Sequence, residues 1–240
     1  TVVGGSALYL VAEEARHKLV RIAAHMLGCA EADVVLEERE AFSRQDRGKT
    51  VAFSELAAAA YQEEKLPPGV TPGLDFSGSF TLGQPYQSPH SFSTHVVAVQ
   101  VSRENGVIEI LDYTAIHDCG RILNPMLVEG QVHGGIAQGI GQALWEGMEY
   151  TEDGQPLTAS LMDYAMPSAQ GLPELRLDTY ETLSPMNPLG IKGVGELPTV
   201  AAPAAVANAV MDALSGFGVQ HIDTPLTPEK VWNVMQGRIG

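Results

Sequence analysis

A glycine-rich loop that ends in one carboxylate is the segment with the clearest potential for chemistry. Residues 187–198 read NPLGIKGVGELP, so three glycines shortly precede Glu196. Glycines let a backbone turn tightly and come close to a ligand. The run at 199–214 carries almost no charge and predicts a buried helix capped by Thr199. A poorly solvated carboxylate beside such a helix accepts protons well, so Glu196 is a candidate general base. Its alternative role is to cap the helix.

A second glycine-rich segment spans 117–141 and reads HDCGRILNPMLVEGQVHGGIAQGIG. Pro125 predicts the start of a helix that runs to about Tyr150. A glycine inside a helix costs roughly 0.5–1 kcal/mol of helix stability relative to alanine. A group that packs closely against these glycines must compensate for this cost. Either another helix packs against the glycines after Gln131, or a bulky ligand covers that face. We assign packing to the glycines and ligand binding to Gln131. These glycines are Gly134, Gly135, Gly139 and Gly141.

The histidines and cysteines predict no metal site. His117 and His133 share no ligand spacing with other histidines or cysteines, which favours packing or surface roles. Cys119 is expected to be a small buried apolar residue. Cys119 and Cys29 are the two cysteines of the sequence, which is too few to ligate an iron–sulfur cluster. A single possible disulfide would stabilise a protein of this size poorly, so we expect a reducing, cytoplasmic location.

The composition excludes several classes of partner. The chain has 14 basic and 29 acidic residues, a net charge of -15, which argues against nucleic acids and anionic membranes. No apolar stretch reaches the roughly 18 residues of a membrane-spanning helix, and no signal peptide opens the sequence. The sequence begins at Thr1 without a methionine. We therefore expect a processed product or a fragment of a longer protein.

The elements expected around these segments form an α+β fold. Helices and mostly antiparallel hairpins alternate without a regular βαβ rhythm, which favours α+β. A long loop rich in Pro, Gly and Ser covers 66–93, with at most one strand near 76–81. We expect helices over 6–27, 54–61, 125–150 and 199–214 and after Thr227-Pro228, and strands over 34–36, 50–53, 96–101, 107–113 and 175–182.

The two glycine-rich segments together resemble those of a known enzyme family. From Thr1 to about Gln236, the chain is similar to the C-terminal part of the molybdenum-binding large subunit of the xanthine oxidase family, the molybdenum hydroxylases. This family includes aldehyde oxidoreductases, aerobic carbon monoxide dehydrogenases and N-heterocycle dehydrogenases. The motifs that carry the resemblance are Gly4-Gly5, the hairpin at 96–113, Asp118-Cys119-Gly120, Asn124-Pro125, Gly130-Gln131, the loop at 190–196 and PLTPEKV at 225–231.

The resemblance implies a fold and a role for Glu196. The whole of 1–240 would be a C-terminal molybdopterin-binding region with antiparallel hairpins packed against helices, divided into subdomains 1–115 and 116–240. Glu196 matches the family's active-site glutamate beside the molybdenum, which takes a proton from a water that the metal activates. No residue of this chain is expected to be a metal ligand.

Five further residues are implied at the cofactor. Gln131 matches a glutamine that hydrogen-bonds molybdopterin near the metal, and an amide suits this task because it can both donate and accept. Gly130 precedes it, and Thr1 ends a loop that meets the cofactor. Lys192 and Gly195 are carried over as neighbours of the glutamate. Lys192 could equally neutralise Glu181 or another acid.

The function that follows is oxidation of a small organic substrate, an aldehyde or an N-heterocycle, with water as the oxygen source. The implied cofactor is molybdopterin with molybdenum, in its cytosine dinucleotide form. Iron–sulfur clusters and FAD would reside on partner chains: an iron–sulfur small subunit and a flavin medium subunit. An N-terminal molybdenum-binding chain would complete the site. Two other functions stay open, namely an N-terminal threonine hydrolase that uses Thr1 and a non-catalytic scaffold subunit.

Overall fold

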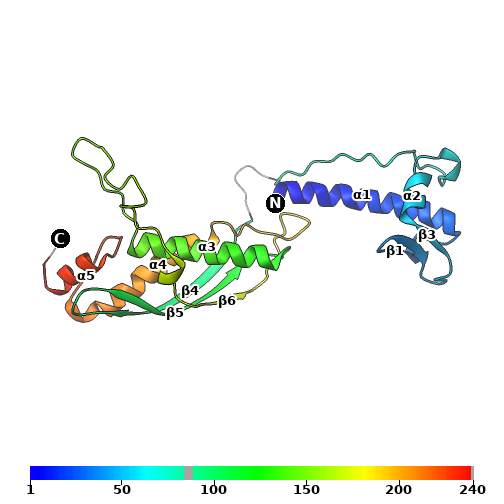
Figure 1. Cartoon of the computed structure of the whole chain (residues 1–240). Coiled ribbons are helices and arrows are strands. Elements are labelled where there is room, and N and C mark those ends of the chain that lie inside the picture. Colours follow the sequence, from blue (N-terminus) through cyan, green and yellow to red (C-terminus); the bar gives the residue numbers. More distant parts are fainter. Residues whose placement is uncertain (84–88, 239–240) are drawn as a thin grey trace. The chain divides into compact units, whose positions relative to one another are not determined.

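The computed structural model describes residues 1–83 and 89–238, and the chain divides into two compact units. Unit 1 comprises Thr1–Gln87 with Asn187–Leu189, and unit 2 comprises Ser88–Met186 with Gly190–Gly240 (Figure 1). This division differs from the expected one at 115/116. Strand β5, Ile108–Asp118, crosses that position, because it pairs along its length with a neighbouring strand of the same unit.

Unit 1 is a long helix packed on a small antiparallel sheet. Helix α1, Val2–Leu27, ends as expected at Gly28, which has a left-handed conformation with φ 65°. The sheet has the order β1-β2-β3, and the shorter helix α2, Phe53–Ala59, follows it. The strands are β1 (Val34–Glu37), β2 (Glu40–Ser43) and β3 (Thr50–Ala52). The buried core contains Ile22, Ala23, Leu27, Ala41, Val51, Leu56, Ala59, Ala60 and Leu66.

The strands expected at 34–36 and 50–53 are present as β1 and β3, but one strand of the sheet was missed. This strand, β2, lies between them and pairs with both. Residues 76–81, where at most one strand was expected, form irregular chain. Residues 84–88 of the predicted long loop lie outside the described residues.

Unit 2 contains the candidate site and is built on a second three-stranded sheet. Strand β4, Phe92–Val101, forms the expected hairpin with β5. Strand β6, Leu175–Thr179, pairs with β5 in parallel, in contrast to the expected antiparallel hairpins. The direction follows from the connection, because the chain between β5 and β6 crosses over through helix α3, Pro125–Leu144.

Helix α4, Leu197–Ala213, packs against both β4 and α3, and with them forms the apolar core of unit 2 (Figure 1). Helix α5, Pro228–Met235, begins as expected, with the Thr227 side chain accepting a hydrogen bond from Lys230 N. The buried core contains Tyr113, Ala115, Val132, Ile136, Ile140, Ala143, Leu144, Ala202, Val206, Val210, Leu214, Leu226 and Val231. No helix among the described residues combines the length and apolar character that a bilayer crossing demands.

The boundaries of α3 and α4 differ from the expected ones. The Asn124 side chain accepts a hydrogen bond from Leu127 N and caps α3, which ends at Leu144 rather than near Tyr150. Helix α4 begins two residues before Thr199, so Thr199 does not cap it. The Thr199 hydroxyl instead donates to the Gly135 carbonyl at 3.2 Å and so joins α4 to α3.

The glycines of α3 allow α4 to approach closely. A Cβ atom added at Gly135 would lie 2.9 Å from Pro198 Cβ, and one added at Gly139 would lie 2.5 Å from Ala202 Cβ. Both distances are too short for real carbon atoms, so only glycine fits at this helix crossing. Packing is therefore confirmed for Gly135 and Gly139, whereas an added Cβ at Gly134 would meet no atom within 4 Å.

Gly139→Ala is expected to destabilise the protein by about 1–3 kcal/mol, the usual cost of overpacking a core. Gly134→Ala is the matched control: because its new methyl group points into open space, it should gain roughly 0.5–1 kcal/mol of helix propensity. The measurement is the free energy of unfolding in urea. Equal stability of the two variants would contradict the close crossing of α3 and α4.

Candidate functional site

Gln131 and the Glu196 loop meet on unit 2. Gln131 lies in the second turn of α3, and Glu196 directly precedes α4, so the packing of the two helices brings both segments together. A Cβ atom added at Gly195 would lie 3.5 Å from Gln131 Oε1, at ordinary contact distance. Gly130, Gln131, Gly195 and Glu196 are all exposed. The structure thus places four of the predicted site residues on adjacent, accessible segments.

The Glu196 carboxylate is not used to stabilise its own helix. Glu196 occupies the position before the first turn of α4, but its side chain accepts no capping hydrogen bond. Only its backbone takes part, since the Glu196 carbonyl accepts from Val200 N at 3.2 Å. The capping alternative is therefore wrong. The expectation of a poorly solvated carboxylate is also not met within this chain, where Glu196 is exposed.

Lys192 forms a buried ion pair with Asp118. Its Nζ lies 2.8 Å from Asp118 Oδ2 and donates to the Thr182 hydroxyl at 2.6 Å. The side chains of Lys192 and Asp118 are only 6% and 9% exposed. Lys192 does neutralise an acid, but Asp118 rather than Glu181, which accepts from Ile122 N instead.

The Asp118 carboxylate is held in its ionised form. Burial by itself raises the pKa of Asp118, but hydrogen bonds from Lys192, the Thr182 hydroxyl, and the amides of Gly120 and Thr182 outweigh it and lower the pKa to about 2. In the sequence, Asp118 stands out only as part of the motif Asp118-Cys119-Gly120. Its partner lies far along the chain, and no local pattern signals such a pair.

Backbone hydrogen bonds join the same segments. Lys192 N donates to the Cys119 carbonyl at 2.8 Å, and the Gly190 carbonyl accepts from both Arg121 N and Ser184 N at 3.1 Å. The start of the Glu196 loop is thereby attached to the chain that follows β5. Cys119 itself is a free, buried thiol, as expected, and burial raises its pKa.

His117 is buried in a short chain of polar side chains. His95 Nε2 lies 3.0 Å from His117 Nε2, and His95 Nδ1 lies 2.8 Å from the Tyr113 hydroxyl. Burial and then the charge of His117 lower the pKa of His95 to about 4, and burial also lowers the pKa of His117. Both rings are therefore neutral near pH 7. His117 Nδ1 is buried and has no partner among the described residues.

His133 and Thr1 are the two remaining candidate positions. His133 is exposed, and its Nδ1 contacts the Glu129 carbonyl at 2.9 Å. Thr1 belongs to unit 1, where it is exposed and precedes α1 without a side-chain capping bond, so its place at the cofactor stays a prediction. Within the described part of the chain, no three His, Cys, Asp or Glu residues are grouped as a metal site would require.

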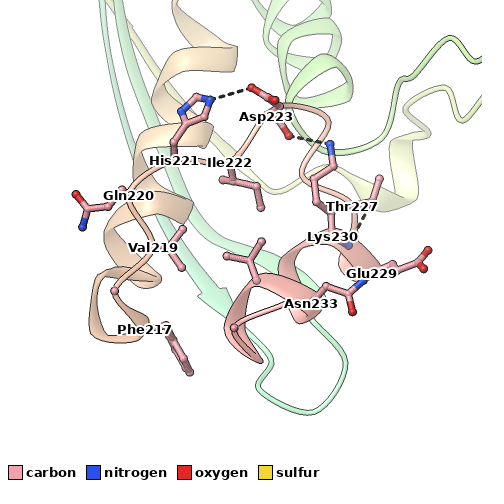
Figure 2. Close-up of a pocket in the computed structure, with 13 residues that line it drawn as sticks. Phe217, Val219, Gln220, His221, Ile222, Asp223, Thr227, Glu229, Lys230 and Asn233 are labelled. Carbon is pink, nitrogen blue, oxygen red and sulfur yellow. Dashed lines mark hydrogen bonds and ion pairs between the residues drawn. The ribbon is translucent and has the colours of Figure 1, made fainter. Parts of the chain in front are cut away.

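A broad cavity of about 960 Å³ lies elsewhere on unit 2, between α5 and the segment that follows α4 (Figure 2). Phe217, Val219 and Ile222 contribute apolar surface. Asp223 accepts hydrogen bonds at this cavity, its carboxylate from His221 at 2.8 Å and its carbonyl from Lys230 Nζ at 2.9 Å. None of the residues that line it is among the predicted site residues.

Comparison with known proteins identifies the family. Residues 1–173 match the model of the molybdopterin cofactor-binding domain, and the chain belongs to this family. It is 38% identical over 239 residues to the nicotine 6-hydroxylase large subunit of Paenarthrobacter nicotinovorans, covering 99% of this chain and 29% of that protein. It is 34% identical to the carbon monoxide dehydrogenase large chain of Hydrogenophaga pseudoflava, covering 98% of this chain and 29% of that one.

Solved structures confirm the fold. Quinoline 2-oxidoreductase from Pseudomonas putida 86 matches with a TM-score of 0.83 and 36% identity, over 95% of this chain and 29% of that one. Carbon monoxide dehydrogenase from Oligotropha carboxidovorans matches with a TM-score of 0.83 and 32% identity, over 98% of this chain and 28% of that chain. The α+β molybdopterin-binding fold and the resemblance to molybdenum hydroxylase large subunits are thus confirmed. The chain spans less than a third of the length of these relatives. The comparisons give no support to a threonine hydrolase.

Proposed function

We propose that this chain forms part of the cofactor and substrate site of a molybdenum-dependent hydroxylase or dehydrogenase. The observation that carries the proposal is the meeting of Gln131 and the Glu196 loop on one accessible surface, where both side chains are exposed. The family and its relatives support it, because the large subunits named above include hydroxylases and dehydrogenases.

The exposed residues fit a molybdopterin cofactor. The Gln131 amide offers both donors and an acceptor, and the Glu196 carboxylate is not engaged in capping its helix. Apolar side chains lie one helical turn away on the same helix faces: Leu127 is 62% exposed on the Gln131 face of α3, and Val200 is 76% exposed on the Glu196 face of α4. Exposed apolar surface next to polar groups is typical of a surface that a ligand or partner covers.

The bound cofactor would supply activation of water and two-electron oxidation of the substrate. Within this chain, the Gln131 amide orients the cofactor by hydrogen bonds, and a Glu196 carboxylate oxygen accepts and holds the proton that leaves the attacking water. Glycine at 195 keeps the backbone beside Gln131 free of a side chain. We propose Gly130 and Thr1 as further contacts of the cofactor. Lys192 contributes through the loop, since its ammonium group is buried against Asp118.

The relatives favour an N-heterocyclic substrate over an aldehyde. Nicotine and quinoline, in the names of the relatives at 38% and 36% identity, both contain a nitrogen heterocycle. We further propose the cytosine dinucleotide form of the cofactor and a complex with iron–sulfur and flavin subunits. The presence of partner subunits is supported by the names of two relatives, a large subunit and a subunit gamma of a dehydrogenase complex, both from Paenarthrobacter nicotinovorans. The free thiols Cys29 and Cys119 support a cytoplasmic location for this complex.

Co-expression tests the proposal. The chain expressed with the N-terminal molybdenum-binding portion and an iron–sulfur subunit is expected to yield a complex that contains molybdenum and a pterin nucleotide. The chain expressed alone is expected to be free of cofactor and prone to aggregate, because its exposed apolar residues lack a cover. The measurements are metal analysis and mass spectrometry of the purified protein. An isolated chain that is monomeric, loaded with molybdenum and active would contradict a site shared between chains.

A further inference from the structure

The carboxylate of Asp118 joins three segments that are distant in the sequence. These are the end of β5, the chain after β6 and the start of the Glu196 loop. Asp118 Oδ1 accepts from Gly120 N at 2.9 Å and from Thr182 N at 3.2 Å. Its Oδ2 accepts from Lys192 Nζ at 2.8 Å and from the Thr182 hydroxyl. Both carboxylate oxygens are therefore fully used within unit 2.

The position of Lys192 depends on this carboxylate. Because the Lys192 side chain is only 6% exposed, its charge would be buried without a counter-ion if Asp118 lost its own charge. A buried, unpaired charge is strongly unfavourable. Lys192 would then turn towards water, and the start of the loop would be attached to the chain after β5 by backbone hydrogen bonds alone.

Glu196 is held from two sides. On the C-terminal side, its carbonyl is part of α4, through the hydrogen bond from Val200 N. On the N-terminal side, Val194 packs against the core of unit 2 and its carbonyl accepts from Leu197 N. The polar anchor before it is Lys192, whose backbone amide donates to the Cys119 carbonyl and whose side chain is bonded to Asp118. Two of the three residues between Lys192 and Glu196 are glycines, which hold no conformation by themselves.

We infer that Asp118 is a positioning residue for Glu196: its ion pair with Lys192 fixes the start of the loop and keeps Gly195 against the Gln131 amide. The inference rests on the proposed role of Glu196 as the proton acceptor. Asp118 acts only through the loop. Its own carboxylate is saturated by hydrogen bonds and is 9% exposed, which leaves no oxygen for a substrate.

The first test measures the loop directly by hydrogen exchange in the assembled enzyme. Asp118→Asn keeps the size of the side chain but removes its charge. Within 190–196, the amide of Lys192, which donates to the Cys119 carbonyl, is expected to exchange about tenfold faster or more, while those of α3 and α4 stay protected. Asp112→Asn is the control, since it removes a charge from the same strand and breaks only the exposed pair with Arg176 at 3.3 Å. Unchanged exchange in the Asp118 variant would overturn the inference.

Lys192→Met gives an independent variant in case Asp118→Asn does not fold. It removes the buried cation and leaves the Asp118 carboxylate with its other three donors. We expect the same faster exchange at 190–196. A folded Lys192→Met enzyme with a fully protected loop overturns the inference as well.

The second test is a double-mutant cycle on kcat. Asp118→Asn is expected to lower kcat by about 10- to 100-fold through misplacement of the carboxylate, with KM almost unchanged. In a Glu196→Gln background it should lower kcat no further, because the two changes act on the same group. Losses that multiply would show that Asp118 acts elsewhere and overturn the inference. Full activity of Glu196→Gln alone would refute the proposed function itself, and the catalytic role of Asp118 with it.

Discussion

Glu196→Gln is expected to lower turnover by about 10²- to 10⁴-fold, the usual share of general-base catalysis. Glutamine keeps the size and the hydrogen-bonding capacity of the side chain but cannot accept a proton. Since the carboxylate does not cap α4, the substitution should leave the fold and the cofactor content close to those of the unaltered enzyme. The measurements are kcat at saturating substrate and molybdenum per protein.

Glu229→Gln is the matched control for this substitution. Glu229 also lies at the beginning of a helix, in the first turn of α5, and its loss should leave turnover within about twofold because it lies outside the proposed site. A Glu196→Gln enzyme that turns over at the normal rate would assign the proton transfer to another group.

Gln131→Ala is expected to reduce cofactor retention or activity by about 10- to 100-fold, as is usual for contacts that support a metal site. Truncation leaves polar groups of the pterin without their hydrogen-bond partner. Cofactor content after gel filtration and kcat would be measured together. Gln138→Ala applies the same change two turns further along the exposed side of α3 and should leave both values near normal.

A role for Gln131 in packing alone predicts a different pattern. Thermal stability would fall, while molybdenum content and turnover would stay normal. The exposure of Gln131 and its contact with the side-chain-free Gly195 both argue for the ligand role.

Local signals in the sequence predicted most of the elements that carry the site. Pro125 and Thr227-Pro228 marked the starts of α3 and α5, and the hairpin expected at 96–113 is formed by β4 and β5, with Glu104-Asn105-Gly106 at its turn. Each of these signals lies within a few residues of the structure it specifies. Prolines at the first turn and turn dipeptides act through local backbone geometry, so they can be interpreted without knowledge of the tertiary fold.

Features that depend on distant residues could not be predicted in this way. Strand β2 has a short, mixed sequence, and it is stable because β1 and β3 pair with both of its edges. Thr199 was expected to cap α4, but its hydroxyl donates to the Gly135 carbonyl of α3, which lies close by in the folded chain. Asp118 became visible as the partner of Lys192 only in the folded chain, because their pairing brings together the segments after β5 and before α4.

The parallel pairing of β5 and β6 has a consequence for synthesis of the chain. When β5 has left the ribosome, β4 can pair with one edge of β5 at once. The other edge of β5 stays unpaired until α3 and then β6 have been synthesised, because β6 is the strand that pairs with it. Helix α4, which covers β4, is made later still. An open strand edge beside an uncovered apolar sheet face is a template for pairing with other nascent chains. Translation between residues 118 and 213 is therefore the interval in which this unit most needs a chaperone.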